Sequence, residues 1–484
     1  MNKPLERANY RVTFIVLLVS VSSFAMLQSL VIPALPTVQA DLHTSQNTVT
    51  WVLTAYLLSA SVFTPIIGRI GDMIGKERML VITLAGLALG TLIAAMSHSI
   101  LMLILGRAVQ GIGGGTLPLS FGIIRDEFPA AKVAGAVGVI AAMLAAGNGV
   151  GLVLAGPIVN SLSFHWLFWI PFVLIVIAAL CAQFFIPESP VRTRGRVSLG
   201  AAALLSTWLV ALLLGVSEGP VWGWGSPRVV GLIVVAALVV AIWIRVESRS
   251  SQPLIDMKMM RVPAVWTINL VAFLFGMGMY SIFAFLPEFL QTSSSTGYGF
   301  GASVAKSGLF LLPQTVMMFL FGLLTGRIAN RIGSKLAVII GATICCTGYI
   351  MLALAHSQAW QIYAMGLLLG MGTGLTFSAM SNLIVQAVPA EQTGVASGMN
   401  ANIRTIGGAV GAAVMSSIVT STLLRGGLPA ESGYTDGFFF VAVVTLAAVV
   451  AALFIPNASP LPGDERHMAH AELAIVPAGT VTEG

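Results

Sequence analysis

Few residues of this chain could bind a charged group, and two arginines inside long apolar runs are the most informative. Arg107 and Arg404 each lie well inside such a run, and no aspartate or glutamate lies at a comparable depth. Charged side chains in apolar surroundings are costly and usually mark a functional site. Each arginine therefore needs polar side chains, carbonyl groups, water or an anionic ligand as partners, unless it only holds helices together. The sequence offers these polar candidates: Gln28, Gln110, Asn148, Asn400 and Asn402.

A charged, glycine-containing motif occurs twice, as "GRIGDMIGKER" at 68–78 and as "GRIANRIGSK" at 326–335. Glycine permits unusual dihedral angles and close backbone approach. We expect Asp72 to accept hydrogen bonds from the first amides of a later helix near Val395, an arrangement worth roughly 0.3 to 2 kcal/mol. The motif would then close the inner end of the protein in one state. The alternative is a basic loop that only sets topology.

The second copy of the motif carries Asn330 where the first carries Asp72. An asparagine can form hydrogen bonds but does not attract a positive helix end by charge. We therefore expect one strong gate and one weak gate. Proton transfer needs a group that titrates, and the candidates are Glu288 first and Asp41 second, both at the boundary of an apolar run. The alternative for these two carboxylates is a solvated charge at a helix end.

A cavity for an apolar ligand is predicted from methionines and aromatic residues inside the later runs. Methionine packs flexibly, and promiscuous sites use such adaptable surfaces. Many of these residues will instead face lipid or pack in the core. Because the interior holds cations and no carboxylate, neutral, zwitterionic or anionic amphiphiles fit it better than multiply charged cations. The cavity candidates are Tyr280, Phe283, Met317 and Phe377, with Gln314 and Asn382 as polar members.

The elements that position these residues are predicted from composition. The 484 residues are 57% hydrophobic and 9% charged, with a mean hydropathy of +0.93. Runs of about 20 apolar residues can cross a bilayer, and in lipid such runs must be helical because every backbone group needs an internal partner. We predict an all-α integral membrane protein with fourteen helices, near residues 12–34, 49–67, 79–97, 101–123, 134–157, 165–186, 198–216, 229–245, 264–287, 303–326, 335–355, 359–380, 394–420 and 437–455.

Lysine and arginine placement predicts the orientation. Of the 24 basic residues, nineteen fall on one side of the predicted helices and three on the other, so we place both termini in the cytoplasm. The basic residues are spread over separate loops, which disfavours nucleic-acid binding. "GDMIGKE" fails as a nucleotide-binding loop because Glu77 replaces the required hydroxyl residue. No metal spacing or catalytic cluster is present, so we expect neither a cofactor nor an enzyme.

An internal repeat divides the chain. The two motif copies are offset by 258 residues, and "FPAAKVAGAVG" at 128–138 matches "VPAEQTGVASG" at 388–398. Transporters are often built from two related halves that rock about a central site. We predict a six-helix bundle over 1–190, two inserted helices with flanking loops over 191–262, a second six-helix bundle over 263–456 and a flexible cytoplasmic tail over 457–484.

These features together resemble the major facilitator superfamily, and specifically its fourteen-helix drug:proton antiporter branch. The loop signature of that family is matched at Gly68, Asp72, Gly75, Lys76, Arg78 and Leu80. "GRAVQGIGGG" at 106–115 is similar to a second signature, with Arg107, Gln110 and Gly111 in place. The resemblance implies the major facilitator fold with two pseudo-symmetric bundles. It also implies that Arg78 belongs to the gate and that Arg107 has a gating or coupling role.

The chain departs from this branch at two places. Leu27 and Gln28 stand where members often carry an aspartate, and the fifth helix reads Gly151-Leu152 with Pro157 displaced from the usual Gly-Pro pair. From the resemblance, and despite these departures, we expect a monomeric exporter of amphiphilic small molecules in the plasma membrane, driven by a proton gradient. One alternative is a dedicated exporter of an endogenous metabolite, lipid or peptide. Another is a receptor or scaffold that transports nothing.

Overall fold

The structure is a computed structural model that describes residues 10–44, 46–188, 198–250, 253–389, 392–424 and 428–456. The predicted tail over 457–484 lies outside these residues, as do residues 191–197 at the predicted start of the insert. Within the described part the chain is helical, and fourteen helical segments are long and apolar enough to cross a membrane. The prediction of an all-α protein with fourteen spans is confirmed.

The long helices are α1 (Tyr10–Val31), α3 (Gln46–Ile74), α4 (Lys76–Ala95), α7 (Ala130–Ser161), α8 (Trp166–Phe185), α9 (Leu199–Trp222), α10 (Pro227–Arg249), α12 (Pro263–Gln291), α13 (Val304–Ile332), α14 (Ser334–Leu354), α15 (Ala359–Gln386), α16 (Thr393–Val419) and α17 (Glu431–Leu453). The fourth span consists of α5 (Ile100–Gln110), the 3-10 helix η2 (Gly111–Gly115) and α6 (Thr116–Glu127). The shorter elements are η1 (Ile32–Ala34), α2 (Leu35–Asp41), α11 (Met257–Met260) and η3 (Ser294–Thr296).

The 3-10 segment η2 was not predicted, because the sequence suggested one continuous helix there. Its run of glycines weakens the α-helix, and its backbone approaches α3 closely. A Cβ atom on Gly111 would lie 2.4 Å from the Cβ atom of Ser59. A second difference concerns Asp41, which the sequence placed in a loop and which the structure places at the end of α2.

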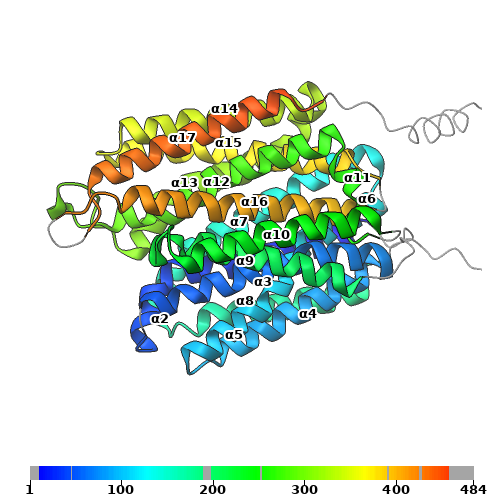
Figure 1. Ribbon diagram of the computed structural model, residues 1–484, viewed down its shortest axis with the longest axis horizontal. Coiled ribbons are helices and arrows are strands. Elements are labelled where there is room, and N and C mark those ends of the chain that lie inside the picture. Colours follow the sequence, from blue (N-terminus) through cyan, green and yellow to red (C-terminus); the bar gives the residue numbers. More distant parts are fainter. Residues whose placement is uncertain are drawn as a thin grey trace, which may run out of the picture.

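The helices form two groups that follow the two halves of the sequence. In Figure 1 the helices of the first half, blue to cyan, lie below those of the second half, yellow to orange. Within the first group α1 packs on α7 and α4 packs on α8, and within the second α13 and α14 pack on α15 while α12 packs on α16. We call the end at which α1 begins and α17 ends the inner end, and the opposite end the outer end.

Helices of the two groups pack on each other most extensively in two pairs, which we call the α3–α16 seam and the α7–α13 seam; α7 also packs on α15, and α6 on α16. Glycines make both possible. A Cβ atom on Gly68 would lie 2.6 Å from the carbonyl oxygen of Gly394, and a Cβ atom on Gly326 would lie 2.8 Å from Cα of Gly135. Gly68 and Gly326 are the equivalent glycines of the two motif copies. The seams therefore repeat the same close approach in the two halves of the molecule.

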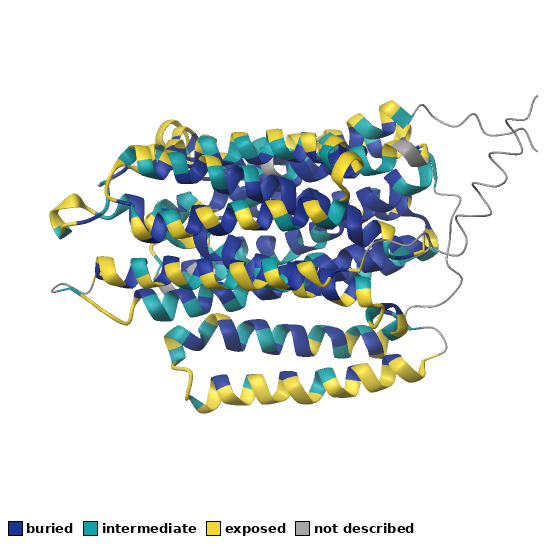
Figure 2. Cartoon of the chain, turned by 90° about the horizontal axis from the view of Figure 1, so that it is seen from above, coloured by how far each residue is buried: buried dark blue, intermediate teal, exposed yellow. Residues whose placement is uncertain are grey.

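Helices α9 and α10 form a layer on the outside of the two groups. They pack on each other, with Trp208 and Trp243 in contact at 5.8 Å between ring centroids, and α9 also packs on α3 and α16. Only 17% of the apolar membrane-spanning stretch of α10 is buried. This helix is the largely exposed one at the lower edge of Figure 2. Their exposed face is apolar, as expected for helices that contact lipid.

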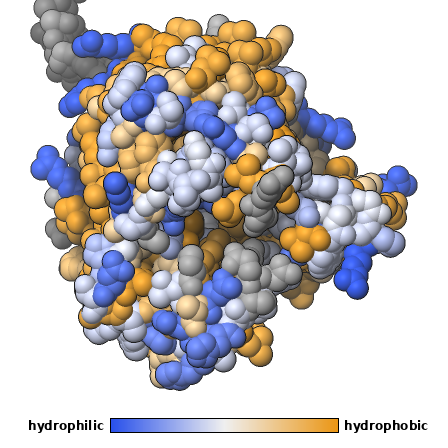
Figure 3. Space-filling view, turned by 90° about the vertical axis from the view of Figure 1, so that its left-hand side faces the viewer, coloured by the Kyte–Doolittle hydropathy of each residue, from blue (hydrophilic) through white to orange (hydrophobic). Residues whose placement is uncertain are grey.

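The outer end of the molecule is more polar than its sides. Figure 3 shows this end, where hydrophilic and weakly polar side chains gather across the face and hydrophobic ones occupy much of the upper and left rim. The exposed apolar side chains along the spans include Leu101, Leu105, Leu238, Val443 and Leu446. A bundle with apolar sides and a polar end is the arrangement that a lipid bilayer requires.

Candidate functional site

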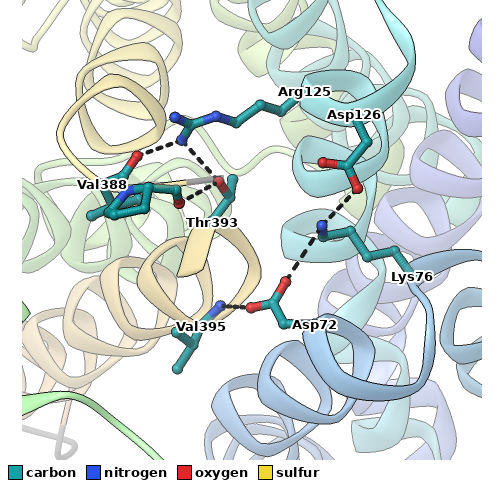
Figure 4. Close-up of polar contacts among 8 residues, drawn as sticks. Asp72, Lys76, Arg125, Asp126, Val388, Thr393 and Val395 are labelled. Carbon is teal, nitrogen blue, oxygen red and sulfur yellow. Dashed lines mark hydrogen bonds and ion pairs between the residues drawn. The ribbon is translucent and has the colours of Figure 1, made fainter. Parts of the chain in front are cut away.

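The inner end is closed by Asp72, which lies near the end of α3 and is fully buried. Its Oδ2 atom accepts a hydrogen bond from the backbone N–H of Val395 at 3.1 Å (Figure 4). Val395 lies in the first turn of α16, where the amides have no partner within the helix. The expected hydrogen bond is therefore present, and a carboxylate at a helix N-terminus is worth up to about 2 kcal/mol when partly buried.

Asp72 belongs to a chain of charges that was not predicted. The Nζ atom of Lys76 lies 3.7 Å from Oδ1 of Asp72 and donates a hydrogen bond to Oδ2 of Asp126 at 2.7 Å (Figure 4). Lys76 itself is fully buried at the start of α4. Because one ammonium group serves two buried carboxylates, its removal would leave both without their partner cation, a change that commonly costs 3 to 5 kcal/mol.

Arg125, at the end of α6, makes a second contact between the two groups of helices. Its guanidinium donates to the carbonyl oxygen of Val388 at 2.7 Å and to Oγ1 of Thr393 at 2.9 Å (Figure 4). It also donates to the carbonyl oxygen of Val385. Val385 lies in the last turn of α15 and Val388 just beyond it. The final carbonyl groups of a helix carry partial negative charge and lack internal partners, so a cation is favoured there.

Gly75 and Arg78 also belong to the predicted gate. Gly75 precedes α4 with φ of 120°, a conformation that favours glycine. A side chain at this position would also meet Glu188. Arg78 is 63% exposed, and its guanidinium lies 3.3 Å from the carboxylate of Glu188. This exposed ion pair contributes little to stability.

The second motif copy lacks an equivalent of the Asp72 contact. Asn330 is exposed, and its side chain makes no hydrogen bond to the described residues. The physical reason is that α7 begins at Ala130, so the part of α7 beside Gly326 lies more than a turn inside the helix. Its amides are already bonded within the helix. The expected weak gate at Asn330 therefore has no hydrogen bond in this structure, although the glycine contact beside it is present.

Arg107 is buried in the first group of helices with only 1% of its surface exposed. Its Nε atom donates to the carbonyl oxygen of Val52 at 3.0 Å, and Nη1 donates to Oε1 of Gln110 at 2.6 Å. The guanidinium also lies over the ring of Tyr56, 4.4 Å from its centroid. The partner predicted from the sequence, Gln110, is thus correct, while Val52 and Tyr56 were not predicted.

Arg404 is buried in the second group, in α16, with 5% of its surface exposed. Its guanidinium lies over the ring of Phe377 in α15, 4.4 Å from the centroid, and it interacts electrostatically with Tyr280 of α12. Among the described residues its Nε atom has no hydrogen-bond partner. Tyr280 lies near Tyr56 of α3, and the hydroxyl group of Tyr56 is in turn near the side chain of Gln28. The structure therefore brings together five of the predicted cavity residues: Gln28, Gln110, Tyr280, Phe377 and Arg404.

The remaining cavity candidates have other contacts. Nδ2 of Asn400 donates to Oδ1 of Asn269 at 2.9 Å, a bond between α16 and α12. The other candidates are distributed as follows: Gln314 and Met317 pack on Gly370, Phe283 packs on a core cluster of the second group, Asn148 is half-buried in α7, and Asn382 is buried in α15 with Nδ2 unbonded to described residues. Their role in a cavity stays a prediction.

The two carboxylates proposed for proton transfer lie near the outer end. Glu288 is in the last turn of α12 and Asp41 ends α2, and both side chains are exposed. Neither carboxylate lies beside Arg107 or Arg404. A cavity of about 840 Å³ lies at the outer ends of α4 and α8. A second cavity, of about 560 Å³, lies at the inner ends of α7, α13 and α14. Their linings contain none of the predicted cavity residues, although Asn330 lines the second.

Comparison with known proteins identifies the family. The family model of the Major Facilitator Superfamily matches residues 17–412, which is most of the chain. The chain belongs to the Major Facilitator Superfamily. The human organic anion transporter MFSD10 (TETRAN), known from a crystal structure, shares the fold with a TM-score of 0.68, at 17% identity over 93% of this chain and 100% of that one.

Relatives of this superfamily member cover most of its length. The tetracenomycin C resistance and export protein of Streptomyces glaucescens is 29% identical over 84% of this chain and 76% of that protein. The multidrug resistance protein Stp of Mycobacterium tuberculosis is 28% identical over 81% of this chain and 72% of its own length. The multidrug transporter protein MdtP of Bacillus subtilis is 26% identical, with coverages of 80% and 71%.

The sequence predicted the Asp72 side of the gate of this superfamily member and missed two residues. Arg125 and Asp126 stand next to each other where the fourth span ends, and Arg125 was expected only as one of the nineteen basic residues on the cytoplasmic side. Adjacent residues on a helix point in different directions, which is how Arg125 contacts α15 while Asp126 contacts Lys76. A charged pair at the end of a membrane span was the available signal. As a major facilitator with fourteen spans, the protein is a multi-pass membrane protein.

Proposed function

We propose that the protein is a secondary active transporter that exports amphiphilic small molecules, including drugs or antibiotics, by alternating access. The proposal is supported by its relatives, which are named for multidrug resistance and for resistance to and export of tetracenomycin C. They are 26 to 29% identical over about four fifths of this chain. A major facilitator of this kind takes a small-molecule substrate and works within a lipid bilayer.

The observation that carries the proposal is the contact between the two groups of helices at the inner end. Asp72 and Arg125 join the first group to the end of α15 and the start of α16 through hydrogen bonds, beside apolar packing that the two groups share. Such contacts can break and form again, since each is worth only a few kcal/mol. A transporter that alternates between two accessible states needs an interface of this strength.

Proton exchange is the proposed energy source, with Glu288 and Asp41 as the candidate carriers. Both lie near the outer end, where protons would enter during export. The excess of lysine and arginine at the inner end supports placing both termini in the cytoplasm and the protein in the plasma membrane. We propose that it acts as a monomer, because each half already supplies one side of both seams.

The test uses purified protein in liposomes and a fluorescent amphiphile, N-phenyl-1-naphthylamine. Transport is followed with a pH gradient across the liposome membrane, and again after a protonophore has removed the gradient. We expect transport that depends on the gradient and falls in the Lys76→Met variant, which leaves Asp72 and Asp126 without their shared cation. Transport that ignores the gradient would reject proton exchange. Absence of transport for this and other amphiphiles would reject the export function.

A further inference from the structure

A row of buried cations and aromatic rings crosses the boundary between the two groups of helices. The row runs from Arg107 to Tyr56 in the first group and from Tyr280 to Arg404 in the second, with Phe377 beneath Arg404. Tyr56 and Tyr280 lie near each other on the two sides of the boundary. We call these five residues the cation–aromatic row. It lies between the helices that must separate if the halves rock against each other.

The two arginines of the row differ in how many of their guanidinium donors form hydrogen bonds. Arg107 donates to a backbone carbonyl and to Gln110, and it also lies on Tyr56. In contrast, Arg404 has the side chain of Tyr280 as a hydrogen-bond partner, but its Nε atom has none among the described residues, and no described carboxylate lies within ion-pair distance of it. A guanidinium that is 95% buried without an anion is costly. Contact with the face of Phe377 and with the side chain of Tyr280 offsets only part of that cost.

Glycines on α12 and α16 place Tyr280 against Arg404. Gly408 lies one turn beyond Arg404 on α16, and a Cβ atom there would lie 2.5 Å from the ring of Tyr280. Gly276 lies one turn before Tyr280 on α12, where a side chain would meet the backbone of Arg404. The two helices thus touch backbone to backbone beside the row. This packing fixes the tyrosine ring and the guanidinium next to each other.

We propose that Arg404 binds the anionic group of the substrate and that the aromatic residues of the row bind its ring system. The substrates would then be aromatic amphiphiles that carry a sulfonate, carboxylate or phenolate group. Arginine suits this role because its planar donors match such groups and because it stacks on aromatic rings. The assignment to substrate rests on the proposed export function, whereas binding of the anion can be measured without transport.

The test measures binding to purified protein in lipid nanodiscs, with empty nanodiscs subtracted. The probes are 8-anilino-1-naphthalenesulfonate and N-phenyl-1-naphthylamine, which differ only by the sulfonate group. The variants are Arg404→Gln, Arg404→Lys and a control, Arg228→Gln, which removes an exposed cation at the start of α10. Each protein is first checked for a single species in gel filtration, and binding of the neutral probe reports whether the site itself is intact.

We expect Arg404→Gln to raise the dissociation constant of the sulfonate probe by about tenfold or more, because a hydrogen bond to a charged group is lost. The neutral probe should bind with unchanged affinity, Arg404→Lys should recover part of the loss, and Arg228→Gln should match the unaltered protein. Equal weakening of both probes in Arg404→Gln and Arg404→Lys would overturn the proposal, because it would mean that Arg404 only holds helices together. Unchanged sulfonate binding would overturn it as well.

A transport measurement separates this proposal from the proposed function. Arg404-dependent binding of the sulfonate without transport of either probe would retain the anion site and reject export. Transport of the neutral probe without Arg404-dependent binding of the sulfonate would retain export and reject the anion site. Selective loss of sulfonate transport in Arg404→Gln would support both proposals together.

Discussion

At the scale of single residues, the inner end is held by side chains whose charge matches the helix end that they contact. The carboxylate of Asp72 lies at the positive start of α16, and the guanidinium of Arg125 lies at the negative end of α15. The two side chains come from the same group of helices and form hydrogen bonds to successive helices of the other group. Their charges are opposite, so together with Lys76 and Asp126 they add no net charge to the buried inner end.

The Asp72→Asn substitution should weaken this closure. Asparagine keeps a hydrogen-bond acceptor but loses the charge interactions with Lys76 and with the start of α16. We expect a loss of roughly 1 to 2 kcal/mol, which shifts the population toward the inwardly open form by about five- to thirtyfold. The measurement is the labelling rate of a cysteine in the Ser397→Cys variant, since Ser397 lies on α16 near the inner end and is only 5% exposed.

The matched control for this prediction is Asn330→Asp, which places a carboxylate at the equivalent position of the second motif. Because Asn330 is exposed and faces no free helix amides, we expect no change in the labelling rate of the same reporter. An effect of Asn330→Asp as large as that of Asp72→Asn would mean that the two motif copies are equivalent. That result would contradict the asymmetry described here.

The Asp72 contact was predictable from sequence, and the contacts around it were not. The sequence alone shows the charged motif, its second copy and the start of the later helix near Val395. The directions of Lys76, Arg125 and Asp126 depend on how α4 and α6 are rotated about their axes. A hydrophobic run as long as a bilayer is thick does not determine that rotation. The same limit explains why Tyr56 was not expected beside Arg107, and why Asn400 was expected in a cavity and is bonded to Asn269.

At the scale of helices, the seams depend on glycine. The positions Gly68 and Gly326 were visible as members of a repeated motif, and their close contacts follow from that repeat. The fourteen spans were also predictable, since the length and composition of each run suffice to define a membrane helix. The 3-10 break in the fourth span was not, because a run of glycines is compatible with several backbone conformations and its packing on α3 decides among them.

The Gly68→Ala substitution should force α3 away from α16. The added methyl group would meet the backbone of Gly394, which cannot move aside as a flexible side chain could. We expect a destabilisation of about 1 to 3 kcal/mol, seen as a lower unfolding temperature in detergent. The control is Gly231→Ala on α10, where a Cβ atom meets nothing within 4 Å and where alanine favours the helix. Equal melting temperatures for the two variants would contradict the importance of the seam.

At the scale of the whole molecule, the α7–α13 seam also extends to the outer end. A Cβ atom on Gly156 of α7 would lie 2.9 Å from the Cβ atom of Ala305 on α13. Two halves that rock against each other must open this contact at some stage of the cycle. The pair therefore offers a direct test of whether the groups of helices move relative to each other during transport.

A disulfide between Gly156→Cys and Ala305→Cys should stop transport. The required separation of about 3.5 to 4.5 Å between Cβ atoms is reached with a small adjustment of either helix. We expect oxidation to abolish dye transport in liposomes and a reductant to restore it, while each single cysteine variant stays active under both conditions. Full transport by the cross-linked protein, with the cross-link verified by mass spectrometry, would show that the outer contact does not need to open.

The position of the inserted helices makes the two sides of the protein unequal. Helix α9 packs on both α3 and α16, and Trp224, just beyond its end, donates a hydrogen bond to Ser417 of α16 at 3.0 Å. A hydrophobic compound that diffuses within the membrane would meet α9 and α10 before it reached the α3–α16 seam. Entry from the lipid would then favour the opposite flank, so the insert would give the protein a preferred direction of lateral approach.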